Sequence, residues 1–188
     1  MRTVLTAIIF AGVLATGAQA ATYEEKLATC LACHGEKGIS ETSEVPSLAG
    51  MPADATLIQL FLFRQGTRKI EIMNDVAKDL TDDDLRKLGD YFAKLPPPQA
   101  AEAPDPAIVE RAKAAVARHH CASCHNPNFS GRDQMPRLAA QREDYLLKAL
   151  RDYKSKQRPG YEPTMDEVMR PVTDVEIVDL SHYLARFR

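Results

Sequence analysis

One short pattern occurs twice in this chain of 188 residues, and it limits the possible folds more than any other feature. Residues 30–34 read Cys-Leu-Ala-Cys-His, and residues 121–125 read Cys-Ala-Ser-Cys-His. Further matches between the two halves keep nearly the same offset of about 90 residues, and they pair 46–50 with 136–140, 80–82 with 172–174, and 88–93 with 180–185. Self-similarity at one offset indicates a duplicated domain with small loop insertions.

The duplication predicts two domains, at residues 22–95 and 106–188. Residues 96–105 between them contain four prolines, a composition typical of a stiff, extended linker. The chain is 45% hydrophobic and 27% charged, as in ordinary soluble globular proteins. Its net charge of only −2 gives no support to binding of nucleic acid by the whole protein.

The first 20 residues are typical of a secretory signal peptide. Arg2 is followed by the apolar stretch Val4–Ala15 and by the small-residue cleavage pattern Ala18-Gln19-Ala20. The alternative, an uncleaved membrane anchor, is disfavoured because the apolar run is well short of the roughly 20 residues needed to span a bilayer. We expect export, cleavage before Ala21 and a soluble or loosely membrane-associated periplasmic protein.

In both repeated motifs the second cysteine is followed at once by a histidine, which is the pattern that attaches haem c. The two thiols add to the two vinyl groups of the porphyrin to form thioethers, and the adjacent histidine lies under the iron as proximal ligand. The motifs therefore predict two covalent haem c groups, held by Cys30, Cys33 and His34, and by Cys121, Cys124 and His125.

Three other uses of the four cysteines fit the sequence less well. A zinc site with four cysteine ligands would use the same two pairs but leaves both following histidines unexplained. A thioredoxin-like site needs a βαβ context, of which the sequence shows no sign. Two local disulfides are the ordinary expectation for an exported protein, but they too give the histidines no role.

The remaining sequence predicts helices only, so the expected fold class is all-α. Thr22 and Asp105-Pro106 are suited to begin the first helix of each unit, each running into its cysteine motif. Apolar residues at helical spacing follow Asp54 and recur at 144–154, and capping boxes begin the last helices at Thr81 and Thr173.

Two methionines occupy equivalent places in the repeat. Met73 precedes Thr81 by eight residues, and Met165 precedes Thr173 by eight, in stretches that we expect to be irregular. Met169 is a rival to Met165, but only Met165 keeps the repeat register. Met51 and Met135 do not occupy equivalent positions to each other, so we expect them to pack in the protein interior.

Together these features resemble a diheme class I cytochrome c of the cytochrome c4 type. The resemblance rests on the two C-x-x-C-H motifs, the Pro-x-Leu-Ala loops, the aromatic-basic pairs, the methionines and the Thr-Asp helix starts. It implies two tandem class I cytochrome c domains, in which His34 with Met73 and His125 with Met165 bind the two haem irons. It also implies that the carbonyls of Pro46 and Pro136 orient the two histidines. The loop before Met165 is two residues longer than its counterpart.

Iron with both axial positions filled has no open site for oxygen, peroxide or substrate, so we expect an electron-transfer protein and no catalytic residues. The main hypothesis is a periplasmic carrier that takes electrons from a quinol-oxidising complex or a dehydrogenase and passes them to a terminal oxidase. One alternative is a diheme subunit of a periplasmic dehydrogenase that oxidises a sulfur compound or an alcohol. A diheme peroxidase, which needs a displaceable ligand, is disfavoured.

The small net charge conceals an uneven distribution. Residues 22–95 carry 9 basic and 13 acidic side chains, a net charge of −4, whereas residues 106–188 carry 14 basic and 11 acidic side chains, a net charge of +3. These charges are either solvated surface without consequence or a means to steer the two domains to partners of different surface charge.

Overall fold

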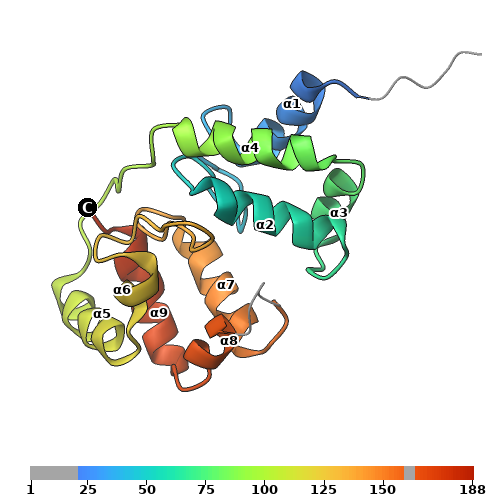
Figure 1. The fold of residues 1–188 in the computed structure, drawn as a ribbon. Helices are drawn as coiled ribbons and strands as arrows, with labels where there is room; N and C mark the ends of the chain where they lie inside the picture. Colours follow the sequence, from blue (N-terminus) through green and yellow to red (C-terminus); the bar gives the residue numbers. More distant parts are fainter. Residues whose placement is uncertain (1–20, 159–163) are drawn as a thin grey trace, which may run out of the picture.

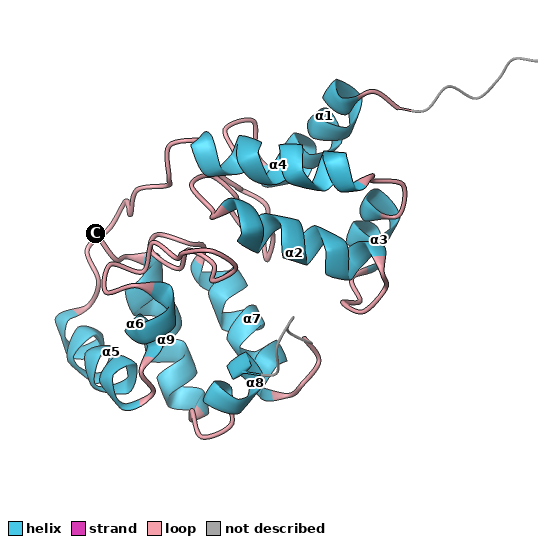
Figure 2. Ribbon diagram, in the orientation of Figure 1, coloured by secondary structure: helices cyan, strands magenta, loops and turns pink. Residues whose placement is uncertain are grey.

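The computed structural model describes residues 21–158 and 164–188 (Figure 1). The predicted signal peptide and the centre of the longer loop before Met165 lie outside the described residues. In the described part helices are joined by loops without any strand, in agreement with the all-α prediction (Figure 2). The helices are α1 (Tyr23–His34), α2 (Ala53–Arg64), α3 (Glu71–Ala77), α4 (Asp82–Lys94), α5 (Pro106–Arg118), α6 (Cys121–His125), α7 (Glu143–Lys154), α8 (Thr164–Met169) and α9 (Asp174–Ala185).

The helices form two groups, each around its own hydrophobic cluster (Figure 1). In the first group α2 packs against α4 and α3, and in the second group α9 packs against α5 and α7. Leu88 and Phe92 of α4 are fully buried in the first cluster, and Ile177 of α9 is fully buried in the second. Neither cluster takes a buried member from the other half of the chain.

The predicted helix starts are found where the sequence places them. Thr81 and Thr173 each accept a side-chain hydrogen bond from the backbone amide three residues on. The carboxylate of that third residue accepts one from the threonine's own amide, which completes a capping box. Thr22 forms the same arrangement at α1, and Asp105 caps α5 ahead of Pro106. These contacts satisfy amides that have no partner within the helix, so they fix where each helix begins.

Two expectations about helices were wrong. The helix that begins at Pro106 does not run into Cys121, because α5 ends at Arg118 and His120 adopts a left-handed backbone with φ of 53° before α6 begins. Met73 and Met165 do not lie in irregular stretches but in the short helices α3 and α8. Among the residues described, no helix has the length and apolar character required to cross a membrane.

Candidate haem sites

The first motif lies at the carboxyl end of α1, which presents its two cysteines differently. Cys30 is buried in the first hydrophobic cluster, whereas Cys33 is exposed. His34 is the last residue of the helix, and its side chain is buried. The last turn of the helix therefore places one cysteine inside the protein and one at its surface, and it ends on the buried imidazole.

The ring of His34 is held by a backbone carbonyl. Its Nδ1 lies 2.8 Å from the carbonyl oxygen of Pro46, and because a carbonyl can only accept, Nδ1 carries the proton. Burial lowers the pKa of His34, and the bond to Pro46 opposes this only in part, so the ring is neutral at pH 7. The lone pair of Nε2 is then available for a metal.

The second motif has the same arrangement of side chains, but it forms a short helix of its own instead of the end of a longer one. Cys121 is half-buried and Cys124 is exposed on the short helix α6, and His125 at its end is buried. Nδ1 of His125 lies 2.8 Å from the carbonyl oxygen of Pro136, and burial likewise lowers the pKa of His125. The structure thus brings His34 and Pro46, and His125 and Pro136, together as the resemblance implies.

The four cysteines are not joined to one another by disulfides, and they lie in two separate helices. Before a haem is attached, burial raises the pKa of the Cys30 thiol to about 11 and also raises that of Cys121, so both thiols would be protonated at neutral pH. In the described ranges no three His, Cys, Asp or Glu side chains are close enough together to bind a metal ion. The structure therefore does not assemble a zinc site from the two cysteine pairs.

The methionines separate into those that pack and those at the margin of the clusters. Met73 and Met165 are both half-buried, each against the cluster of its own half. Met169 is 2% exposed inside the second cluster, where the repeat places the fully buried Ala77 in the first. Met169 therefore fills core space, and Met165 is the counterpart of Met73 in structure as well as in sequence.

Two arginines between the halves were not singled out from the sequence. Arg68 and Arg158 occupy equivalent positions about 90 residues apart, and both are buried. Arg68 lies over the ring of Phe63 at 4.5 Å, and Arg158 lies over that of Tyr153 at 4.8 Å. The signal in the sequence that indicates them is that an arginine recurs at the offset of the repeat.

The surroundings of these arginines fit an anionic group. In the described part of the chain neither guanidinium forms an ion pair with a carboxylate, and the buried Nε of Arg158 has no hydrogen-bond partner. A buried cation without a counter-charge is costly. Haem c carries two propionate carboxylates, so these side chains fit the cofactor that the motifs indicate.

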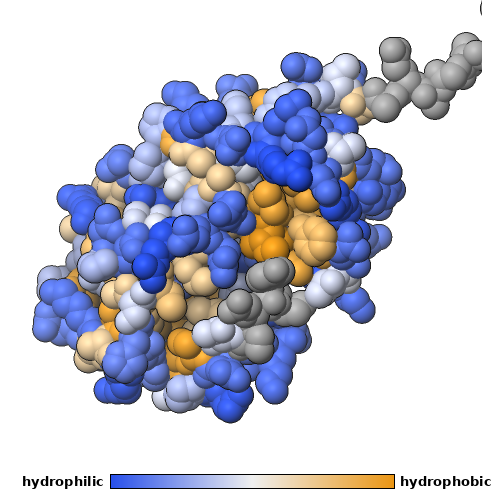
Figure 3. All heavy atoms as spheres, in the orientation of Figure 1, coloured by the Kyte–Doolittle hydropathy of each residue, from blue (hydrophilic) through white to orange (hydrophobic). Residues whose placement is uncertain are grey.

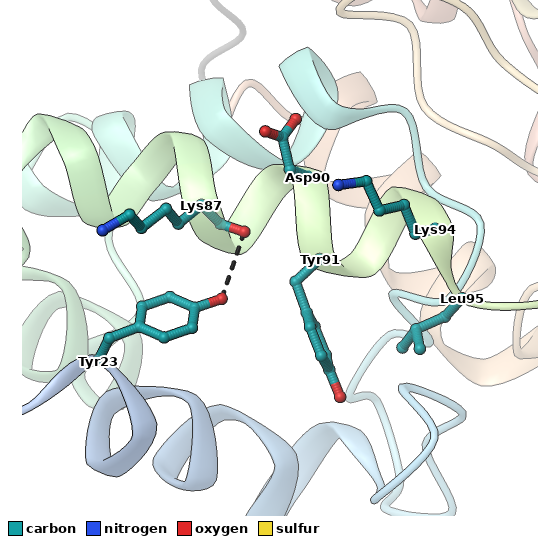
Figure 4. Close-up of a pocket in the computed structure, with 6 residues that line it drawn as sticks. All are labelled: Tyr23, Lys87, Asp90, Tyr91, Lys94 and Leu95. Carbon is teal, nitrogen blue, oxygen red and sulfur yellow. Dashed lines mark hydrogen bonds between the residues drawn. The ribbon is translucent and has the colours of Figure 1, made fainter.

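Figure 3 shows a largely hydrophilic surface on which apolar side chains gather where α2 and α3 lie in Figure 1. Helix α3 carries Met73 and the exposed Ile72. A separate groove of about 360 Å³ lies between α1 and α4, and its lining has no histidine, cysteine or methionine (Figure 4). That lining consists of Tyr23, Lys87, Asp90, Tyr91, Lys94 and Leu95.

Two helical domains, each with a C-x-x-C-H motif and a carbonyl-bound histidine, define a diheme c-type cytochrome. Residues 109–187 match the family model described as cytochrome c, and residues 15–92 match that of the cbb3-type cytochrome c oxidase subunit III. The chain is 30% identical to cytochrome c4 of Thiocapsa roseopersicina over 82% of this chain and 85% of the relative. The chain belongs to the cytochrome c4 family.

Two further comparisons agree. The crystal structure of reduced recombinant cytochrome c4 from Pseudomonas stutzeri superimposes with a TM-score of 0.79 at 28% identity, covering 88% of this chain and 97% of that one. A protein of Thiomonas intermedia named thiosulfate dehydrogenase electron acceptor is 30% identical over 84% of this chain and 78% of its own length. This chain carries two covalently bound haem c groups and is an electron-transfer protein, not an enzyme, so the peroxidase hypothesis is set aside.

Proposed function

We propose that this cytochrome relays single electrons between a donor and an acceptor protein in the periplasm, with one haem centre in each half of the chain. The observation that carries the proposal is the pair of equivalent histidines, each buried and each held by a proline carbonyl at 2.8 Å. In this assignment Cys30, Cys33, Cys121 and Cys124 anchor the haems. Haem iron supplies a centre that alternates between ferrous and ferric states without a change of ligands.

The axial ligands in this proposal are His34 with Met73, and His125 with Met165. Each histidine offers Nε2 because Nδ1 is committed to a carbonyl, and each methionine lies in a short helix at the margin of its cluster. A methionine sulfur bound to the iron would favour the ferrous state and so raise the reduction potential. It also leaves no position for a substrate, which suits electron transfer.

Pro46 and Pro136 orient the proximal histidines, and Arg68 and Arg158 would hold propionate carboxylates at the boundary between the halves. The functional division is residues 22–95 and 106–188, joined by the linker 96–105 after removal of the signal peptide 1–20. Support comes from the two separate hydrophobic clusters.

For partners we propose a quinol-oxidising complex or a dehydrogenase as donor and a terminal oxidase as acceptor. A second candidate is a subunit or dedicated acceptor of a periplasmic dehydrogenase. That candidate is favoured by the resemblance to the protein named thiosulfate dehydrogenase electron acceptor. Co-purification with a dehydrogenase, compared with reduction of the free cytochrome by a quinol-oxidising complex, distinguishes the two.

The test is an optical and redox titration of the purified holoprotein. We expect two haems per chain, both low-spin in each oxidation state and both at positive potential. A haem that is high-spin and binds cyanide or turns over peroxide in the unmodified protein would overturn the proposal. A holoprotein with one haem would overturn the assignment of the second motif.

A further inference from the structure

A glutamine from the second half of the chain holds the loop that positions the histidine of the first half. Gln141 donates from Nε2 to the carbonyl of Ser47 and accepts from the Ser47 amide at Oε1, both at 2.8 Å. Both residues are less than 5% exposed. Ser47 directly follows Pro46, so the carbonyl of Pro46 and the amide of Ser47 form one peptide group. The carbonyl of this group bonds to His34, and its N–H donates to Gln141.

The opposite contact exists but is chemically weaker. Met51 is the repeat counterpart of Gln141, since the amide of each donates to the carbonyl of the leucine three residues before it. Sδ of Met51 accepts from the amide of Arg137 at 3.3 Å. Arg137 directly follows Pro136, whose carbonyl holds His125. Each half therefore touches the proline peptide of the other, one through an amide oxygen and one through a thioether.

The two acceptors polarise their peptide groups to different extents. A carboxamide oxygen is a strong acceptor, whereas a thioether sulfur is a weak one. A hydrogen bond at the N–H of a peptide group strengthens the bond that its carbonyl accepts, because successive hydrogen bonds polarise one another. The carbonyl of Pro46 is therefore a better acceptor than that of Pro136. It draws more strongly on the Nδ1 proton and makes the His34 ring the more electron-rich ligand.

We infer that Gln141 and Met51 are positioning residues that set the two haem potentials apart, with Gln141 lowering the potential of the centre at His34. A more electron-rich imidazole stabilises the ferric state, so the centre in the first half is the weaker oxidant. The inference rests on the proposed function, because it takes His34 and His125 to be the proximal ligands. It makes the reduction potential of one domain depend on a side chain of the other.

The test uses two reciprocal variants of the holoprotein. Gln141→Met gives both proline peptides a thioether neighbour, and Met51→Gln gives both a carboxamide. Ser43→Ala is the matched control, because Ser43 donates across the same boundary to Asp144 at 3.1 Å but does not touch the Pro46–Ser47 peptide. Redox titration followed by NMR assigns each potential to its haem, and the Nδ1–H signals of 15N-labelled histidine report the two proline bonds.

We expect Gln141→Met to raise only the potential of the His34 centre and to weaken the hydrogen-bond signature of its Nδ1–H. The equilibrium constant for electron exchange between the haems should change about twofold, which is about 18 mV at about 59 mV per tenfold change. Met51→Gln should lower only the potential of the His125 centre. Ser43→Ala should leave both potentials unchanged.

Equal shifts of both haems, or no shift with an unchanged His34 Nδ1–H signal, would overturn the inference. Met51→Gln adds a partner and leaves the Gln141 contact intact, so it decides the question if Gln141→Met fails to fold. Failure of the proposed function is seen separately, since an unmodified protein without two histidine-ligated low-spin haems would reveal it before any variant is made.

Discussion

Arg68 and Arg158, one from each half of the chain, donate to the same oxygen, Oε1 of Gln59. Arg158 also donates to the hydroxyl of Tyr145 at 3.0 Å. Burial would raise the pKa of Tyr145, but the charges of Arg158 and Arg68 outweigh it and lower the pKa to about 8. Two like charges that share neutral partners form a strongly positive site at the boundary between the domains.

Removing either positive charge should lower a haem potential, because the ferric centre bears one more positive charge than the ferrous one. For Arg158→Gln we expect a decrease on the order of 70 mV, which is the Coulomb energy of a unit charge at an assumed separation of about 10 Å and an effective dielectric constant of about 20. Arg158→Lys keeps the charge and should retain most of the potential. Redox titration checks this, and equal shifts in the Gln and Lys variants would contradict an electrostatic role.

Met73→Ala and Met165→Ala should each remove one methionine–iron absorption band and leave the other haem unchanged. The opened position should bind cyanide, which optical titration detects. Met169→Leu is the matched control for the second domain, since a change of similar volume in the buried cluster should cost less than about 1.5 kcal/mol and keep both bands. Loss of the band in Met169→Leu but not in Met165→Ala would reverse the assignment.

What the sequence predicted well was local or repeated. The capping boxes at Thr81 and Thr173 need only four residues each, and the haem motifs carry their chemistry in five. Helices α3 and α8 were missed because seven and six residues are too few to show helical periodicity. The break before α6 depends on the left-handed backbone of His120, a residue type that does not demand one.

The contacts between the halves were not predictable from the sequence in the same way. Gln141 and Ser47 are 94 residues apart, and nothing in either local sequence indicates that a side-chain amide meets a backbone amide there. Met51 was expected only to pack, yet its sulfur accepts a hydrogen bond from Arg137. Such pairs depend on how two domains dock, whereas periodicity and capping report on one element at a time.

Two capping carboxylates should make the protein sensitive to acid. Burial raises the pKa of Asp84, but hydrogen bonds from Lys26 and Thr81 outweigh it and lower the pKa to about 2. The amide of Thr173, its hydroxyl and His119 lower the pKa of Glu176 to about 2 against the effect of burial. A carboxyl pKa below its unfolded value of about 4 contributes stability above that pH, and the contribution is lost as pH falls from about 4 to about 2.

Asp84→Asn and Glu176→Gln should therefore each destabilise the holoprotein at pH 7, by about 1 kcal/mol. The difference in the free energy of unfolding between variant and unmodified protein should shrink toward pH 2, because Asp84 and Glu176 of the unmodified protein become protonated there. Denaturant unfolding at a series of pH values measures this. Asp90→Asn, at an exposed position of the same helix, is the control, and a pH-independent difference for Asp84→Asn would show that the charge is not responsible.

The uneven charge of the two domains should appear in the salt dependence of electron transfer. If the −4 and +3 halves steer partners of opposite surface charge, then rates with each physiological partner should fall as ionic strength rises, because salt screens long-range attraction. Glu36→Lys changes the charge of the first half near Cys33, and Arg132→Glu changes that of the second half near Cys124. Each variant should alter the electron-transfer rate with one partner and leave the rate with the other unchanged. Stopped-flow rates that stay flat across salt, or that respond equally to both variants, would leave the charges as solvated surface alone.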